Sequence, residues 1–380
     1  MNKICFVTET YPPDINGVAL TLEKIINGFV LKNYSVSIIT PKSQRSDNQQ
    51  SSRLSIPMTF VKGFAFPFYR EARFGLPCRS LLYKSWSVSK PDLVHIATEG
   101  PLGYSALCVA NDLNIPVVSD FRTNFHEYGK YYGIGKLRKL IFLYLRYFHN
   151  KTDRTLVPTR KLAEFLQKSK FAKISVVPRG VDINLFHPRK RNPKTKRTLG
   201  FEDDSFNLLS VGRLAKEKNL DLVIDVFFKF RKISNKVMLI FVGDGPYIGE
   251  LKERCPDALF VGYKTASELS EYYANADLLV FPSLTETFGN VTLEALASGL
   301  PVLSFDTAAA KELVIDGENG FTVNVFQDKA FVKKAIQIFD HVDLGNIRNN
   351  ARRTAEQNCW DQIIRRTEKE FMDVFNVTKK

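Results

Sequence analysis

The chain has 380 residues, of which 44% are apolar, and its formal net charge at pH 7 is +14. This length and apolar content support a sizeable core and favour about two domains. No apolar run approaches the roughly 18 residues of a membrane-spanning helix. The five cysteines are scattered without a C-x-x-C pair, so neither a disulfide framework nor a zinc site is expected. We therefore expect a cytoplasmic location.

The predicted elements begin with KICFVTE (3–9), which is too short for the apolar core of a signal peptide and is typical of a buried strand. Similar β-branched runs recur through the first half of the chain. Helical patterns, such as that of residues 18–33, separate them. The further strands expected in this half cover 36–41, 93–98 and 116–121.

The first half also carries all of the excess positive charge. Residues 1–180 contain 26 Lys and Arg against 12 Asp and Glu, whereas residues 181–380 contain 28 of each. Two stretches, 61–86 and 135–151, interleave these cations with aromatic residues. This composition is typical of a surface that binds anionic lipids, although the aromatics could be core and the cations a solvated rim. We therefore predict an anionic partner for the N-terminal half.

The second half repeats the alternation after a polar stretch at 187–205, which we interpret as a linker rather than a nucleic-acid patch. Near-continuous apolar strands joined by helices indicate parallel sheets covered on both faces. The predicted fold class is α/β, with two doubly wound Rossmann-like domains facing a central cleft and ligands at the carboxyl ends of the strands. The strands expected here cover 206–212, 237–243, 259–262, 277–283 and 301–305.

The segment SVGRLAKEKNLDLVI (210–224) ends a predicted strand at Gly212 and places two cations in the loop and helix start that follow. Arg213 as a planar fork and Lys218 as a point charge are suited to a diphosphate at this edge of the sheet. Alternatively, Arg213 pairs with a surface carboxylate and Lys218 is solvated. The turn FVGDGPY (241–247) follows the next strand, with glycines where a backbone approaches a ligand or simply turns.

The segment FPSLTETFGNVTLEALASGLPVL (281–303) sets Glu286 and Glu294 on either side of a predicted helix N-terminus near Gly289 and Asn290. Such an N-terminus at the end of a strand favours a phosphate. The two carboxylates would repel a phosphate but accept hydrogen bonds from hydroxyl groups on either side of it. A nucleotide sugar has this layout. The alternative is that Glu286 caps the helix and Glu294 lies on its exposed face.

Together these motifs resemble retaining glycosyltransferases of family four, which have the GT-B fold. The resemblance covers essentially the whole chain and is nearest to bacterial GDP-mannose-dependent α-mannosyltransferases and glycolipid-forming enzymes. It implies an acceptor-binding domain over 1–185, a nucleotide-sugar-binding domain over 186–359 and a C-terminal helix, 360–380, that crosses back to the first domain. The motifs are TETYPPDINGVALTLEKI (8–25), SDFRTNFHEYGKYYGIGKLRK (119–139), VPRGVDINLFHP (177–188), VGRLAKEKN (211–219), VGDGP (242–246) and the Glu286–Glu294 pair.

The resemblance assigns a donor-side role to each candidate site residue of the second half. Glu294 would hold the ribose hydroxyl groups and Glu286 would face the donor hexose, while Arg213 and Lys218 would neutralise the diphosphate. The remaining donor-binding residues would contact the sugar (Thr287, Phe288, Gly289), the phosphate (Asn290, Val291, Gly212 and, from the first half, Gly17) or the base (Gly262, Tyr263).

The first half departs from the family pattern at the reaction centre. Many members carry a His where this chain has Arg122, and His126 follows four residues later. Three alternatives stay open for these residues. Arg122 contacts the donor or the acceptor, His126 reaches into the cleft, or His126 packs under the next helix. Both are candidates for the catalytic role. The acceptor-side candidates are Asp120, Thr98, Glu99 and Asn16, where Asn16 replaces a common glycine and Glu99 could equally be a helix-turn residue.

The predicted activity is retaining, metal-independent hexosyl transfer without a cofactor, in which the departing phosphate oxygen takes the acceptor proton. The resemblance favours mannose from GDP-mannose, moved to a lipid-linked or glycolipid acceptor by an enzyme on the inner face of the cell membrane. UDP-glucose as donor and a soluble sugar as acceptor stay open, as does an epimerase. A nucleic-acid binder would leave Glu286 and Glu294 unexplained, so no nucleic-acid partner is expected.

Overall fold

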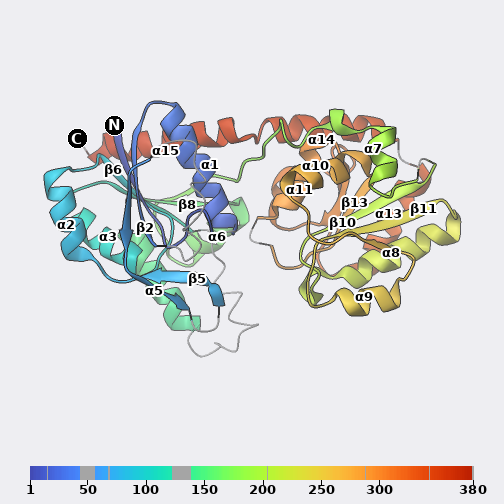
Figure 1. Ribbon diagram of the computed structural model, residues 1–380, viewed down its shortest axis with the longest axis horizontal. Coiled ribbons are helices and arrows are strands. Elements are labelled where there is room, and N and C mark those ends of the chain that lie inside the picture. The colour runs from blue at the N-terminus through green and yellow to red at the C-terminus, as the bar shows by residue number, and fades with distance from the viewer. Residues whose placement is uncertain are drawn as a thin grey trace. The chain divides into compact units, whose positions relative to one another are not determined.

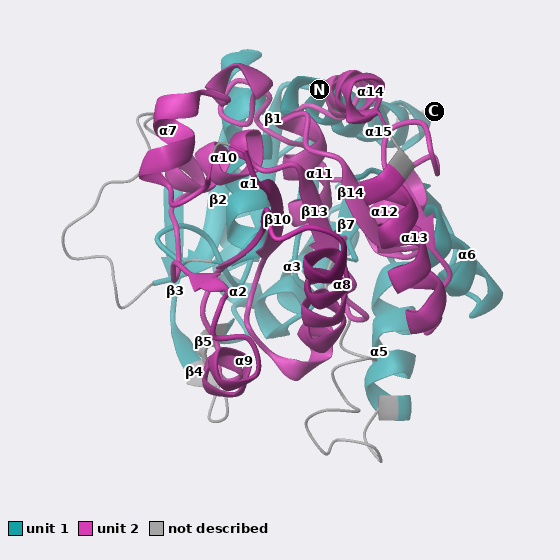
Figure 2. Ribbon diagram, turned by 90° about the vertical axis from the view of Figure 1, so that its right-hand side faces the viewer, with its two compact units in different colours: residues 1–178, 360–380 teal, residues 179–359 magenta. Residues whose placement is uncertain are grey.

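The computed structural model describes residues 1–14, 16–42, 56–66, 69–121, 138–202, 204–286, 288–341 and 343–378. The chain divides into two compact units, Met1–Pro178 together with Trp360–Lys380, and Arg179–Cys359 (Figure 2). It therefore returns to the first unit with its last helix.

The first unit is built on a parallel sheet (Figure 1). Its strands are β1 Lys3–Val7, β2 Ser35–Pro41, β3 Met58–Val61, β6 Leu93–Ile96, β7 Val117–Asp120, β8 Arg154–Val157 and β9 Ile174–Val176, with a separate antiparallel hairpin of β4 Gly63–Phe66 and β5 Tyr69–Gly75. Its helices are α1 Gly17–Leu31, α2 Arg79–Val88, α3 Pro101–Asp112, α5 Arg138–Asn150, α6 Arg160–Lys168 and α15 Trp360–Thr378. The strand order β3-β2-β1-β6-β7-β8-β9 reverses between β1 and β6.

Helices cover both faces of this sheet because successive strand residues point to opposite sides. On β1, Ile4 and Phe6 lie in the core formed with α1 and α15, whereas Cys5 and Val7 lie in the core formed with α2 and α3. The last helix, α15, is fixed by Glu368, which pairs with Lys32 and accepts a hydrogen bond from the Tyr34 hydroxyl at 2.8 Å.

The second unit is built on another parallel sheet. Its strands are β10 Phe206–Val211, β11 Val237–Val242, β12 Leu259–Phe260, β13 Leu278–Phe281, β14 Val302–Phe305 and β15 Phe321–Val323. Its helices are η1 Pro188–Lys190, α7 Pro193–Thr198, η2 Lys216–Lys218, α8 Leu220–Ile233, α9 Ile248–Arg254, α10 Ala266–Asn275, α11 Asn290–Ala297, α12 Ala308–Leu313, α13 Asp328–His341 and α14 Leu344–Glu356. The order β12-β11-β10-β13-β14-β15 reverses between β10 and β13.

Alternation along β10 again separates two cores. Leu208 packs into the cluster that includes side chains of α8 and α13, and Leu209 packs into the cluster that includes side chains of α10, α11 and α14. Two parallel Rossmann-like sheets with helices on both faces confirm the predicted fold class. The predicted linker at 187–205 is wrong, because η1 and α7 lie there within the second unit, α7 packs on α10, and Phe201 is buried.

Two glycine-containing turns at the carboxyl edge of the second sheet pack directly on each other. Gly243, after β11, has a left-handed φ of +138°, and a Cβ there would overlap the carbonyl oxygen of Gly212 after β10. The amide of Leu214 donates to the carbonyl of Asp244 at 2.9 Å. These glycines therefore serve backbone-to-backbone packing, which fixes the loop that carries Arg213.

We expect Gly243→Ala to lower the free energy of unfolding by about 3–5 kcal/mol, because both the φ angle and the backbone contact exclude a Cβ. Gly249→Ala is the matched control, since a Cβ at that position in α9 meets nothing within 4 Å. The control should be neutral or stabilising by up to about 1 kcal/mol. Thermal unfolding of both variants measures the difference, and equal midpoints would contradict the expected clash.

Candidate functional site

Two residues from separate sequence motifs meet where the strand order of the second unit reverses. Lys218, at the end of η2, lies with its Nζ 2.6 Å from Oε1 of Glu286, which follows β13. In parallel α/β sheets, the carboxyl edge at such a reversal is where ligands bind. The contact therefore places a cation and a carboxylate of the predicted site side by side.

Glu286 is held firmly for a loop residue. The Ser283 hydroxyl donates to the same Oε1 at 2.9 Å, and the side chains of Lys218 and Glu286 are 19% and 18% exposed. Gly289, not Glu286, occupies the N-cap position of α11. The alternatives of a helix-capping Glu286 and a solvated Lys218 are therefore wrong for this structure.

The N-terminus of α11 lies between the two candidate carboxylates along the chain. Gly289 adopts a left-handed φ of +90°, Phe288 is buried, and the Phe288 carbonyl accepts from the Ala309 amide at 2.6 Å. The helix begins at Asn290, and the first N–H groups of a helix, here those of Asn290 and Val291, have no intrahelical acceptor and attract an anion. Thr287 lies outside the described residues.

Glu294 lies in the second turn of α11 and is half-buried rather than on an exposed face. Its Oε2 accepts a hydrogen bond from the Tyr273 hydroxyl of α10 at 3.1 Å. Burial raises the pKa of Glu294 to about 7, while the hydrogen bond from Tyr273 opposes that rise. The same burial and the neighbouring carboxylate raise the pKa of Tyr273 far above its ordinary value. Glu294 can therefore accept hydrogen bonds best above neutral pH.

The other donor-side candidates, Gly212, Arg213, Gly262 and Tyr263, follow strands β10 and β12 of the same sheet. The side chain of Arg213 is 63% exposed and pairs with Glu217 across 4.0 Å. This is the alternative considered above, in which Arg213 pairs with a surface carboxylate. A Cβ at Gly212 or Gly262 would meet nothing within 4 Å, and Tyr263 is exposed. Lys218 is thus brought into contact with Glu286, whereas Arg213 pairs with Glu217.

Three of the acceptor-side candidates, Asn16, Thr98 and Glu99, follow β1 or β6, where the sheet of the first unit reverses, and the fourth, Asp120, ends β7. Asn16 caps α1 by accepting from the amides of Val18 and Ala19, so it has a structural role, and Gly17 begins the helix. The Thr98 hydroxyl accepts from the Glu9 amide at 2.8 Å.

Both acceptor-side carboxylates, Glu99 and Asp120, are directed into the protein. Glu99 is 6% exposed, and its Oε1 lies 3.2 Å from Nε2 of His149. Asp120 is fully buried, with Oδ2 3.2 Å from Nε2 of His95. This geometry does not present Asp120 to a ligand, so its acceptor role stays a prediction without structural support. Arg122 and His126 lie outside the described residues.

Three residues around the candidate sites of the two units, Glu9, Ser283 and Tyr273, were not predicted from the sequence. Glu9 lies two residues after the end of β1, is buried, and accepts hydrogen bonds from the amides of Gly75 and Leu102. Burial is the main reason that its pKa rises to about 7. A carboxylate two residues after a buried strand was a signal that could have identified Glu9. Ser283 and Tyr273 carried no such signal, because a serine after a strand and a tyrosine in a helix are ordinary.

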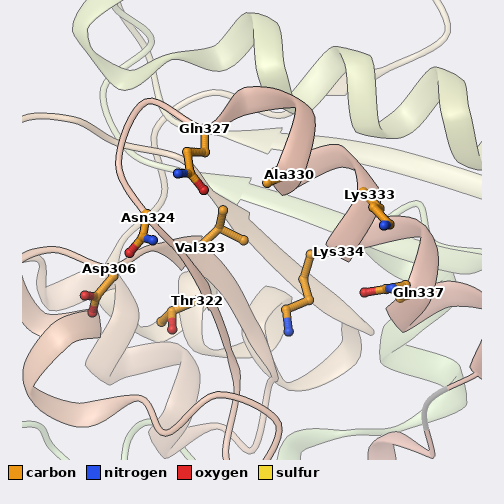
Figure 3. A pocket seen from close by; sticks show the side chains of 9 residues that line it. All are labelled: Asp306, Thr322, Val323, Asn324, Gln327, Ala330, Lys333, Lys334 and Gln337. Carbon is orange, nitrogen blue, oxygen red and sulfur yellow. The ribbon is translucent and has the colours of Figure 1, made fainter.

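A polar hollow of about 390 Å³ lies elsewhere on the second unit, near the ends of β14 and β15 and along α13 (Figure 3). Asp306, Thr322, Asn324 and Lys334 line it. None of the candidate residues named above is among its lining. Within the described ranges, no cluster of three His, Cys, Asp or Glu is placed to hold a metal ion. No helix in those ranges is both long and apolar enough to cross a membrane.

Comparison with protein families gives two adjoining matches. Residues 15–185 match the model described as Glycosyltransferase Family 4, and residues 191–357 match the model described as Glycosyl transferases group 1. Together they include every candidate residue of both units except Glu9.

Two curated relatives match most of the chain. A "GDP-mannose-dependent alpha-mannosyltransferase" of Mycobacterium tuberculosis is 30% identical over 326 residues, covering 85% of this chain and 84% of that protein. An "Alpha-monoglucosyldiacylglycerol synthase" of Streptococcus pneumoniae is 30% identical over 327 residues, covering 83% of this chain and 73% of that protein.

Among solved structures, a sucrose-phosphate synthase from Thermosynechococcus elongatus has a TM-score of 0.78 at 17% identity and covers 99% of this chain and 100% of that one. At this identity the likeness shows the fold alone.

Proposed function

This chain belongs to glycosyltransferase family 4, and from that premise we propose that it transfers mannose from GDP-mannose to a lipid-linked or glycolipid acceptor. It has the GT-B fold and is a glycosyltransferase, retaining and metal-independent as its family is. The observation that carries the proposal is the arrangement of Glu286 and Glu294 around the N-terminus of α11, with Lys218 bound to the first of them.

In the proposed donor complex, the diphosphate lies against the first amides of α11, where the helix dipole favours negative charge. Glu294 accepts from the ribose hydroxyl groups and Glu286 from a hexose hydroxyl group. Lys218 and Arg213 neutralise the diphosphate, with Arg213 turning from its exposed contact with Glu217. A surface pair of this kind is worth little, so turning away costs little.

The proposed chemistry breaks the bond between the anomeric carbon and the phosphate oxygen while the acceptor oxygen bonds to that carbon on the same face. Negative charge grows on the departing diphosphate, so fixed cations there stabilise the transition state more than the ground state. The departing phosphate oxygen takes the acceptor proton. We propose that Arg122 or His126 contacts the reacting groups from the first unit.

The choice of mannose and of a lipid acceptor is supported by the names of the two relatives. The mycobacterial relative is named for GDP-mannose, and the pneumococcal relative for a glucosyl lipid. UDP-glucose therefore stays the second candidate donor, and the name of the pneumococcal relative is the observation that favours it.

A membrane-facing role for the first unit is supported by α5. Leu140, Leu143, Tyr144 and Tyr147 recur at three- and four-residue steps on this helix, and all are exposed. Cationic side chains flank them, including Lys139 and Lys151, which are also exposed. An apolar stripe with a basic border is what binding to an anionic membrane surface requires. We propose that the enzyme works at such a surface as a peripheral protein.

Calorimetric titration of the protein with GDP and with UDP tests the donor. We expect GDP to bind and UDP to bind at least about tenfold more weakly, a difference of about 1.4 kcal/mol. The reverse order would replace mannose by glucose, and no binding of either nucleotide would refute the proposed donor site. Transfer from GDP-mannose to acceptor lipid in anionic vesicles then tests the acceptor, against a soluble sugar as the competing acceptor.

A further inference from the structure

We propose that Ser283 and Tyr273 are positioning residues of the donor site, which aim Glu286 at the hexose and Glu294 at the ribose, respectively. The inference rests on the proposed function, because it assigns each hydroxyl group to one half of the bound nucleotide sugar. It concerns two residues whose place in the sequence gave no signal of such a role.

Ser283 holds one oxygen of Glu286. It is 3% exposed, and its hydroxyl donates to Oε1 at 2.9 Å, the oxygen that Lys218 Nζ also contacts at 2.6 Å. Oε2 makes no hydrogen bond to a described residue, so it is the oxygen left for a ligand. Two donors on one oxygen fix the orientation of the carboxylate. Without them, this side chain of a loop residue would be free to rotate.

Tyr273 does the same for Glu294 from a different helix. The ring is fully buried and contacts Phe186 at 5.9 Å between centroids, so its hydroxyl has a fixed position. That hydroxyl donates to Oε2 of Glu294 at 3.1 Å, and Oε1 makes no hydrogen bond within the described part of the chain. Each carboxylate thus has one oxygen engaged by a protein hydroxyl and the other available.

The charged groups around Glu294 leave Tyr273 as its direct partner. On α14, Arg348 and Arg352 donate to the backbone oxygens of Gly299 and Ala297, past the second turn of α11. Glu286, which precedes α11 in the chain, is paired with Lys218. The remaining charged side chains of the packed helices are Arg353 and Glu356 on α14, Lys311 and Glu312 on α12, and Glu268 and Glu271 on α10. Removing the Tyr273 hydroxyl should therefore raise the pH at which Glu294 ionises.

The experiment compares GDP and GDP-mannose binding to Ser283→Ala and Tyr273→Phe, each of which removes one oxygen atom. Ser283→Ala should weaken GDP-mannose roughly tenfold, the size of one hydrogen bond to a charged group, and leave GDP within about twofold. Tyr273→Phe should weaken both ligands by the same factor, roughly tenfold, because the ribose is common to both. Ser283→Thr keeps the hydroxyl and should restore GDP-mannose binding.

Matched controls lie on the same elements. Tyr272→Phe removes the neighbouring hydroxyl of α10, and Ser298→Ala removes a buried hydroxyl at the end of α11 that has no partner among the described residues. Both should bind both ligands like wild type. A pH profile adds a readout that a merely structural role would not move. Wild-type GDP affinity should fall as pH drops through about 7, and in Tyr273→Phe the fall should begin at higher pH.

The outcomes distinguish a failure of the proposed function from a failure of the positioning roles of Ser283 and Tyr273. If wild-type protein binds neither GDP nor UDP, the proposed function fails before the variants matter; if it binds UDP, the same comparison is made with UDP and UDP-glucose. If wild type binds and Ser283→Ala weakens both ligands equally, or Tyr273→Phe weakens neither and keeps the wild-type pH profile, the positioning roles are overturned.

Discussion

Glu294→Ala should weaken nucleotide binding by at least about a hundredfold, close to 2.7 kcal/mol, because it removes an ionised acceptor of two ribose hydrogen bonds. Calorimetry with GDP at pH 8 measures the loss. At that pH the wild-type carboxylate is ionised, since burial places its pKa at about 7. Glu253→Ala, on the exposed face of α9, removes a carboxylate from the same unit and should bind GDP like wild type.

The loss of binding should come without a loss of stability in the isosteric Glu294→Gln variant. A carboxyl group whose folded pKa lies above its unfolded value binds its proton more tightly in the native state. Its contribution to stability therefore falls as pH rises from about 4.5 towards 7 and is lowest above that range. Glutamine does not ionise, so its thermal midpoint at pH 8 should equal or exceed that of wild type. A variant that both unfolds and loses GDP binding would instead assign Glu294 a structural role.

The presence of a parallel sheet in each half of the chain was predictable, because parallel strands are buried on both faces and appear as apolar runs. Every strand predicted for the second half is present, and so are those predicted for the first half. The strands β3, β4 and β5 were missed, and so were the short strands β8, β9 and β15. Arg154 begins β8, and β9 and β15 have three residues each, so none forms an apolar run of recognisable length.

The candidate site was predictable as two local motifs but not as a set of contacts. Residue types and their distance from a strand end indicated that Lys218 and Glu286 lie at one sheet edge. Their direct pairing at 2.6 Å joins positions 68 residues apart, and it depends on how η2 and the loop after β13 pack. Tyr273 was out of reach for the same reason, because its contact with Glu294 arises from α10 packing on α11.

Lys218→Met should lower kcat for glycosyl transfer by about 10²–10³, with a weaker effect on GDP binding of roughly tenfold. The methionine stem keeps the volume of the side chain and removes its charge. The difference between the two effects follows because charge on the diphosphate is greatest as the glycosidic bond breaks. Steady-state kinetics with GDP-mannose and calorimetry with GDP give the two numbers.

Lys216→Met is the control for Lys218→Met. It lies two residues earlier in the same turn, η2, its side chain is 72% exposed, and it pairs with Glu250 at 3.3 Å, away from Glu286. Its kcat should stay within about twofold of wild type. In the double variant Lys218→Met/Glu286→Gln, the losses should be smaller than the sum of the single losses, because the two side chains touch in the free enzyme and share one ligand. Additive losses would mean that the pair acts as two independent groups. Unchanged kcat in Lys218→Met would remove this lysine from the reaction and leave Arg213 as the cation of the second unit that serves the departing diphosphate.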